Sequence, residues 1–254
     1  MADSDSTYEA YRYYPSLAAA VIFIVLFLCT TSFHLYQLLR TRTWYFIPFV
    51  IGGFFEWIGY IGRAISSQQS PNWTIGPYLI QTLLLLLAPA VFSASIYMEL
   101  GRIILLVDGE KNSIIKRAWL TKIFVLGDVL SFVTQAIGGS IMASGTLSAM
   151  QTGAHIIVGG LLIQVLFFGF FITVAVLFDL RMSKHPTPQW TDPSIPSQKH
   201  LKVLYIASVL IMIRSVFRVV EYVQGNDGYL LRHEYYLYIF DSVLMFCVMV
   251  VFHV

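Results

Sequence analysis

Charged side chains inside an apolar stretch are the residues of this chain whose types and spacing could do chemistry. Arg214, Arg218 and Glu221 lie within a hydrophobic run that begins near Leu201. At helical spacing the three fall at positions i, i+4 and i+7, and therefore on one helix face. A charge that faces lipid at mid-depth costs roughly 2.5 to 3.5 kcal/mol on insertion scales. We therefore expect this face to turn inward, toward polar partners, water or a polar ligand.

Polar residues at similar depth occur in the other apolar segments. Two roles fit them: buried salt bridges that fix helix packing, or the lining of a polar cavity, because ionisable groups within a membrane usually mark a functional path. For any one residue the two roles are equally good, and for the whole set we favour the cavity. The sequence thus predicts a polar, ligand-binding cavity in the outer half of the membrane, formed by Glu56, Arg63, Gln81, Asp128, Gln135, Arg214, Arg218, Glu221 and Asp241.

A second charged pair and several pairs of glycines are weaker indications of function. Glu99 and Arg102 form an i, i+3 pair near the inner interface, where long side chains reach water at little cost. We expect a structural pair there, with an inner gate as the alternative. The glycine pairs 52–53, 138–139 and 159–160 are expected to allow close helix contact.

The segments that must position these residues are hydrophobic helices. The chain has 254 residues, of which 57% are hydrophobic and 12% charged, about half the charged fraction of a soluble domain. A hydrocarbon core of ~30 Å needs ~20 residues per helix. We predict an all-α membrane protein, with an extracellular segment at 1–14 and one seven-helix domain at 15–254. Its helices are expected at about 15–39, 44–66, 76–106, 118–142, 153–180, 200–224 and 233–254.

The loops predict the orientation. If the N-terminus is outside and the C-terminus cytoplasmic, the outer loops hold a single basic residue, Arg232. The inner loops then hold Arg40, Arg42, Lys111, Lys116, Arg117, Arg181, Lys184 and Lys199. This agrees with the excess of Lys and Arg on the cytoplasmic side of membrane proteins. Asn72 begins an Asn-Trp-Thr sequon in the first outer loop and is a glycosylation candidate.

Several classes of function are disfavoured. The net charge is only +2 and no basic run occurs, so a nucleic-acid partner is not expected. No nucleotide-binding or hydrolase motif is present. The histidines do not converge at one depth, which disfavours a zinc-dependent intramembrane hydrolase. We expect no enzyme activity, no metal and no cofactor, although a bound lipid or sterol would fit.

Three strings give the chain a family resemblance, supported by GYIGR at 59–63 and GGLLIQ at 159–164. They are QTLLLLLAPAVFSASIYMELGR (81–102), FVLGDVLSFVTQAIGGS (124–140) and RSVFRVVEYVQGNDGYLLRHEYYLYIFD (214–241). The chain resembles the fungal RTA-like (resistance to aminocholesterol) lipid-translocating exporter family. The resemblance implies a seven-helix protein of the plasma membrane or an internal membrane. It also implies stress resistance and the movement of sphingoid long-chain bases, with one branch associated with protoporphyrin and haem.

The expectation that follows is a translocator of lipids or other amphiphiles, with membrane lipids or amphiphilic small molecules as its partners. The amine of a sphingoid base could be held by Glu56, Asp128, Glu221 or Asp241. The arginines would then neutralise the empty site. Two alternatives stay open: a seven-helix, receptor-like lipid sensor, and a haem or porphyrin carrier with His155 as an axial ligand.

Overall fold

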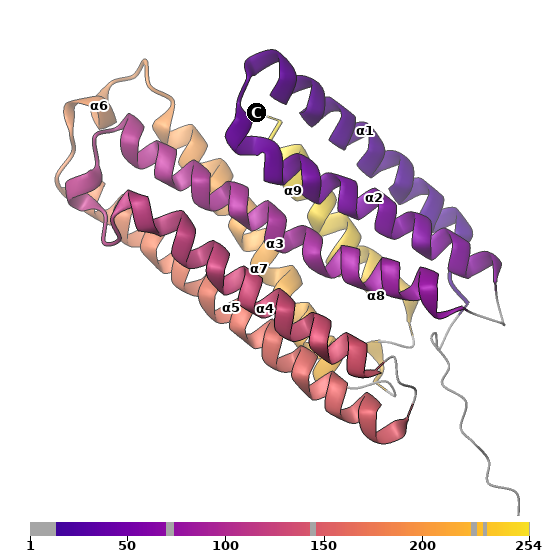
Figure 1. Ribbon diagram of the computed structural model, residues 1–254. Helices are drawn as coiled ribbons and strands as arrows, with labels where there is room; N and C mark the ends of the chain where they lie inside the picture. The colour runs from indigo at the N-terminus through magenta and orange to yellow at the C-terminus, as the bar shows by residue number, and fades with distance from the viewer. Residues whose placement is uncertain (1–13, 70–73, 143–145, 225–227, 231–232, 254) are drawn as a thin grey trace, which may run out of the picture.

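The protein is a bundle of long helices lying side by side (Figure 1). The computed structural model describes residues 14–69, 74–142, 146–224, 228–230 and 233–253, and no β-strand occurs among them. Seven of its helices are long and apolar enough to cross a membrane. The predicted seven-helix, multi-pass membrane fold is therefore confirmed. We call the end of the bundle where the first helix begins the N-terminal end, and the opposite end the C-terminal end.

The spans alternate in direction along the chain. The first three are α1 (Leu17–Thr41), α2 (Ile47–Gln68), which follows the 3₁₀ turn η1 (Trp44–Phe46), and α3 (Ile75–Leu106). The next three are α4 (Arg117–Met142), α5 (Leu147–Lys184) and α7 (Ser197–Gln224). The last span has three parts: α8 (Glu234–Leu237), the π-helix η4 (Tyr238–Val243) and α9 (Leu244–Val251).

The helix α5 differs most from the prediction, because it begins at Leu147 instead of residue 153 and ends at Lys184 instead of residue 180. The hydroxyl of Thr146 caps its first turn by accepting from the Ala149 N–H at 3.2 Å. Hydropathy marks only the part of a helix that lies in lipid, whereas backbone hydrogen bonds and a cap extend this helix beyond it.

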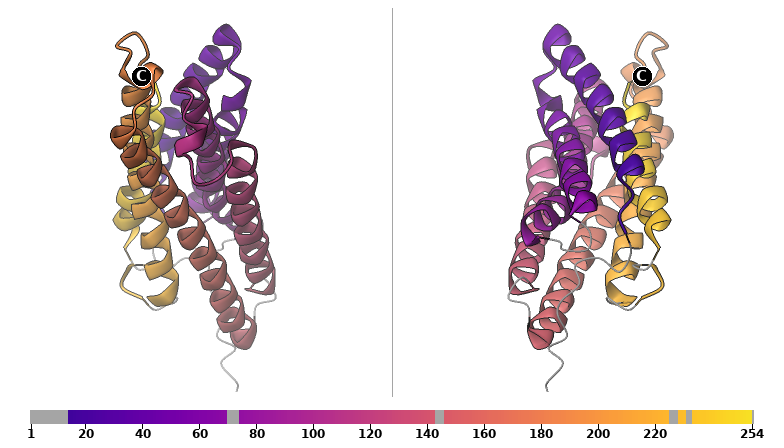
Figure 2. Two further views of the ribbon diagram at one scale, coloured as in Figure 1. Left: turned by 90° about the vertical axis from the view of Figure 1, so that its left-hand side faces the viewer. Right: turned by 90° about the vertical axis from the view of Figure 1, so that its right-hand side faces the viewer.

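The helix α3 occupies the middle of the bundle. It contacts α2, α4 and α7, while α7 also contacts α5 and the last span. The two views of Figure 2 show α4 and α5 converging toward one end of the bundle, where they reach beyond the other helices. Of the polar residues of interest on α3, Gln81 and Glu99 are buried in the bundle, whereas Arg102 is exposed.

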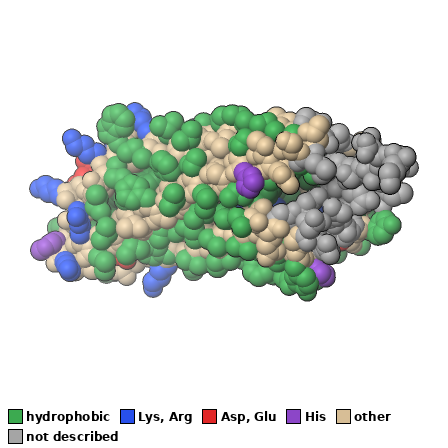
Figure 3. Space-filling view, turned by 90° about the horizontal axis from the view of Figure 1, so that it is seen from below, with side chains coloured by type: hydrophobic (Ala, Val, Ile, Leu, Met, Phe, Trp, Pro, Cys, Tyr) green, Lys and Arg blue, Asp and Glu red, His purple; other side chains and the backbone are tan. Residues whose placement is uncertain are grey.

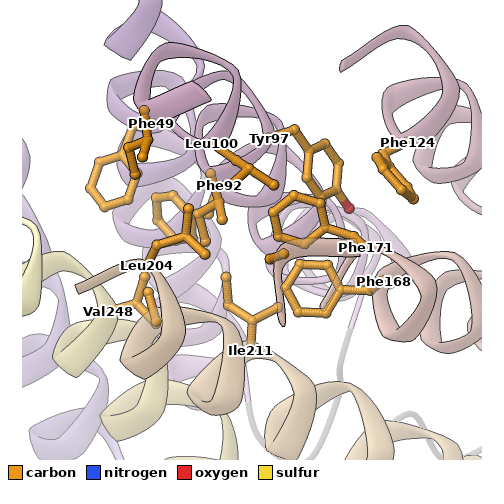
Figure 4. Packing of buried hydrophobic residues seen from close by; sticks show 14 of the residues in the cluster. Phe49, Phe92, Tyr97, Leu100, Phe124, Phe168, Phe171, Leu204, Ile211 and Val248 are labelled. Atoms are coloured by element: carbon orange, nitrogen blue, oxygen red, sulfur yellow. The ribbon is translucent and has the colours of Figure 1, made fainter. Parts of the chain in front are cut away.

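The outer surface and the core are both apolar. Leu126 and Leu166 are among the most exposed large hydrophobic residues, as expected of surfaces that face lipid instead of water. Figure 3 shows hydrophobic side chains along the body and the Lys and Arg side chains gathered at one end. Within the bundle, the Tyr97 ring packs against aromatic rings from α4 and α5 (Figure 4).

The proline-rich connector after α5 is partly helical. It contains the short helix α6 (Pro188–Thr191). The Thr187 hydroxyl donates to the Val107 carbonyl at 2.6 Å, and Trp190 is buried. This connector therefore covers the C-terminal end of α3, because a buried tryptophan and a capping threonine anchor it there.

Glycines allow α4 and α5 to touch through their backbones. A Cβ on Gly138 would lie 2.7 Å from the carbonyl oxygen of Gly153, and one on Gly160 would lie 2.9 Å from that of Ser131. Neither distance leaves room for a side chain. A Cβ on the neighbouring Gly139 would meet nothing within 4 Å.

Candidate functional site

A buried network of charges joins α7 to the last span. The carboxylate of Asp241 accepts from Arg214 Nε at 2.5 Å and from Arg218 Nη2 at 2.6 Å. The other terminal nitrogen of Arg218 donates to Glu221 at 2.7 Å. We call these four residues, together with Glu56 of α2, the arginine cluster. The inward turn expected of this α7 face is thus what the structure shows.

Two backbone irregularities position the cluster. Asp241 lies within the π-helix η4. π-Helical turns are rare in proteins, and those that occur are often found at functional sites. On α3, the Leu85 carbonyl accepts from Arg214 Nη2 at 2.5 Å. That carbonyl would normally accept from the N–H four residues later, but Pro89 occupies that position and has no N–H. The proline therefore leaves an acceptor inside the bundle, and the arginine occupies it.

Glu56 is the member of the arginine cluster that lacks a bonded cation. Only 1% of its surface is exposed, and its Oε1 atom has no hydrogen-bond partner. It lies close enough to Asp241 and to both arginines to interact with them electrostatically. Two guanidinium groups thus face three carboxylates, which leaves an excess of one negative charge when all are ionised.

Two donors of the cluster also lack partners. Neither Arg214 Nη1 nor Arg218 Nε makes a hydrogen bond. Buried polar groups are usually satisfied, so unpaired ones need an occupant such as water or a ligand. The cluster therefore offers one unpaired acceptor and two unpaired donors, and the arrangement could take one additional positive charge from a proton or an amine.

Arg63 belongs to a separate network at the N-terminal end of the bundle. Its Nη2 donates to Glu234 at 2.7 Å, and its Nε donates to the Tyr238 hydroxyl at 3.0 Å. Glu234 also accepts from the Ser16 N–H at 2.8 Å. This network ties together the start of α1, the end of α2 and α8. The predicted cavity set omitted Glu234, although its spacing from Asp241 puts both on one helix face.

The polar residues of α4 also lie outside the arginine cluster. Gln135 donates to Ser131 at 2.6 Å, and Ser131 donates to the Gly160 carbonyl at 2.7 Å. This chain of hydrogen bonds fixes α4 against α5. Asp128 is buried, and the polar side chain with which it interacts is Tyr97 of α3.

The remaining predicted cavity residue, Gln81, lies on α3 against Gly62 of α2. The structure thus brings together Glu56, Arg214, Arg218, Glu221 and Asp241. The hydrogen bonds and contacts described above for Arg63, Asp128 and Gln135 are made outside this cluster. This differs from the expectation that Arg63, Asp128 and Gln135 line one cavity together with the arginines of α7. Helical spacing gives the residues that share a face, but the choice of neighbouring helix depends on close contacts such as those at Gly160.

The predicted pair at the C-terminal end takes a different form. Glu99 pairs with His200 of α7 at 3.3 Å, and the Arg102 guanidinium lies 3.6 Å from the centre of the Tyr45 ring. Among the described residues, Glu99 and Arg102 are therefore not paired with each other. Each finds a partner on an adjacent element, and an arginine over an aromatic ring gains cation–π attraction.

The structure gives less information about two further candidates, His155 and Asn72. His155 is exposed on α5, and the described part of the chain holds no group of three or more His, Cys, Asp or Glu that could bind a metal ion. Asn72, the glycosylation candidate, lies outside the described residues. The role of His155 as an axial haem ligand stays a prediction.

The fold and the buried charges define an integral membrane protein with an ionisable centre. The chain belongs to the RTA1-like protein family, whose model matches residues 49–254. The family resemblance seen in the sequence is thereby confirmed.

Three relatives from Saccharomyces cerevisiae illustrate the family. Protein RTA1 is 39% identical, and the match covers 96% of this chain and 84% of that protein. Protoporphyrin uptake protein 1 is 36% identical, with 100% and 94% covered. The sphingoid long-chain base transporter RSB1 (strain Lalvin EC1118) is 28% identical, with 91% and 69% covered. No solved structure matches this chain. Two of these relatives are thus named for transport or uptake, which supports membrane transport in general.

Proposed function

We propose that the protein is not an enzyme but a translocator of amphiphiles that carry a cationic amine, such as sphingoid long-chain bases. The observation that supports this most is Glu56, a buried carboxylate with an unpaired oxygen in a cluster of excess negative charge. A relative named as a sphingoid long-chain base transporter agrees with this class of substrate.

Charge balance explains why an amine fits. A protonated amine beside Glu56 would neutralise the excess charge of the arginine cluster, and a buried charge is tolerated only when it is paired and hydrogen-bonded. Hydroxyl oxygens near the amine could accept from Arg214 Nη1 and Arg218 Nε, which have no partners. The hydrocarbon tail would stay in lipid or against the apolar helix surfaces.

A porphyrin is the second candidate substrate, because a relative is named as a protoporphyrin uptake protein. Its carboxylates could accept from the unpaired nitrogens of Arg214 and Arg218. They would also add negative charge beside Glu56, in a cluster that already has an excess. Electrostatics therefore favours the amine over the porphyrin.

The test is lipid movement in liposomes that contain the purified protein. We expect the protein to accelerate transfer of a labelled long-chain base between leaflets, and Glu56→Gln to slow that protein-dependent transfer by about tenfold or more. A hydrogen bond to a charged group contributes about 1.5–3 kcal/mol, and 1.4 kcal/mol is already tenfold. The matched control is Glu110→Gln in the 3₁₀ turn η2 (Glu110–Asn112), because Glu110 is exposed.

A second compound tests the contribution of the amine separately from that of the hydrocarbon tail. The N-acylated form of the same base keeps the hydrocarbon chain but carries no positive charge, so the protein should not accelerate its transfer. Equal acceleration of both compounds would contradict the role given to Glu56. If the wild-type protein binds the base tightly from one side without moving it, the sensor is the better description. Faster movement of protoporphyrin than of the base would favour the second candidate.

A further inference from the structure

A second unpaired carboxylate lies between α3 and α4, apart from the arginine cluster. Asp128 is 5% exposed, and neither of its oxygen atoms has a hydrogen-bond partner. The hydroxyl of Tyr97, across the contact between the two helices, also has no hydrogen-bond partner. The two side chains are close enough to interact electrostatically. Three polar oxygens thus meet in the interior, where the Tyr97 hydroxyl is the polar group that faces the Asp128 carboxyl group.

Aromatic rings surround this place. The Tyr97 ring centre lies 4.6 Å from that of Phe171, 5.3 Å from that of Phe124 and 6.1 Å from that of Phe168. Figure 4 shows the Tyr97 hydroxyl oxygen among these rings. Phe124 is also one helical turn before Asp128 on the same helix. An isolated ionised carboxylate in such apolar surroundings is very costly, and such a group becomes neutral instead.

Within the described ranges of the chain, the elements packed against Asp128 supply no cation to offset that cost. On α3 the nearby titratable group is Tyr97, whose side chain carries no positive charge in either protonation state. Two contacts of α4 show which part of α5 lies opposite Asp128. Ser131 donates to the Gly160 carbonyl, and Gly127 packs against Phe167, so the opposite part of α5 is the stretch between Gly160 and Phe167. The titratable side chains of α5 lie toward its ends, at His155 on one side and at 179–184 on the other.

The basic groups elsewhere in the bundle are engaged or distant. Arg214 and Arg218 are bound to Asp241, and Lys122 lies near the ring of Trp119 on α4 itself. His200 pairs with Glu99 at the C-terminal end. Since no described basic side chain is paired with Asp128, a proton from water is the smallest cation that could neutralise its carboxyl group.

We propose that Asp128 is a proton-binding site between α3 and α4, separate from the arginine cluster. In the conformation described here the carboxyl group holds the proton. When α3 and α4 move apart enough to admit water, the proton passes to a water molecule and leaves the carboxylate. The site would give a membrane transporter a group through which substrate movement can be linked to a proton gradient. The proposal does not depend on which molecule is transported.

Infrared spectroscopy of the reconstituted protein tests this directly. We expect a carbonyl stretching band from a protonated carboxyl group, lost in Asp128→Asn and unchanged in Asp179→Asn. Asp179 is the matched control on α5, because it is only half-buried and accepts from the Tyr205 hydroxyl at 3.4 Å. In D₂O the band should shift, because an exchangeable proton is replaced by a deuteron.

Tyr97→Phe provides a second variant that leaves the carboxyl group in place. Removal of the hydroxyl should shift the frequency of the Asp128 band without abolishing it. Absence of the band in the wild-type protein would overturn the proposal, since the carboxylate would then be ionised. A band that never shifts in D₂O would also overturn it, because a proton that cannot leave serves no exchange. These measurements need no transported lipid, so their failure is distinguishable from failure of the proposed function.

Discussion

Replacing Asp241 with asparagine is expected to lower the free energy of unfolding by about 3–5 kcal/mol. The carboxylate is the acceptor for both Arg214 and Arg218, at 2.5 and 2.6 Å. An amide keeps the shape but loses the charge, so Arg214, which is 0% exposed, would be left as a buried cation. Thermal unfolding of the purified protein in detergent measures the loss.

The control for this prediction is Asp108→Asn, at the turn after α3. Asp108 is exposed and has a positive φ of 49°, which asparagine also tolerates. It should unfold at nearly the wild-type temperature. A combined Arg214→Met, Asp241→Leu variant should lose less stability than Asp241→Asn alone, because it removes both charges of a pair together. If Asp241→Asn is as stable as the wild type, the arginines are not held by that carboxylate.

Gly138→Leu is expected to prevent normal packing of α4 against α5 and to cost about 3 kcal/mol. The first atom of the new side chain would already lie 2.7 Å from the Gly153 carbonyl oxygen. A backbone atom cannot rotate away as a side chain can, so the two helices would have to separate. The yield of monodisperse protein after size-exclusion chromatography, together with the unfolding temperature, measures the effect.

Gly139→Leu makes the same chemical change one residue away and is the matched control. A Cβ at Gly139 would meet no atom within 4 Å, and a larger apolar side chain there would only extend into open space. We expect it to behave like the wild type, and helix propensity favours leucine over glycine by somewhat less than about 1 kcal/mol. Equal damage from the two substitutions would show that helix contact is not the cause.

Hydropathy was sufficient to predict the seven spans, because a lipid core demands about 20 apolar residues for each helix. It could not predict the extra length of α5, where the Thr146 cap and polar first turns continue the helix beyond lipid. It also missed the packing of Trp190 against the bundle, since buried contacts made by a connector leave no periodic pattern.

The arginine cluster was predictable in part. The spacing of Arg214, Arg218 and Glu221 was enough to show that one face of α7 is polar and buried. It could not show that Arg63 pairs with Glu234 instead, because that depends on which helices are neighbours. One signal was readable in the sequence. A proline inside α3 frees the carbonyl four residues earlier, and Leu85 is the acceptor that Arg214 uses.

The sharing of one carboxylate by two arginines makes the contact between α7 and the last span cooperative. Asp241 cannot move away from Arg214 without also straining its bond to Arg218, because one rigid carboxylate group holds both. A small displacement is resisted by two charge-assisted bonds, and a larger one breaks both together. Movement of the last span away from α7 would therefore have to break both bonds together, which is the kind of contact on which discrete, two-state interfaces are built.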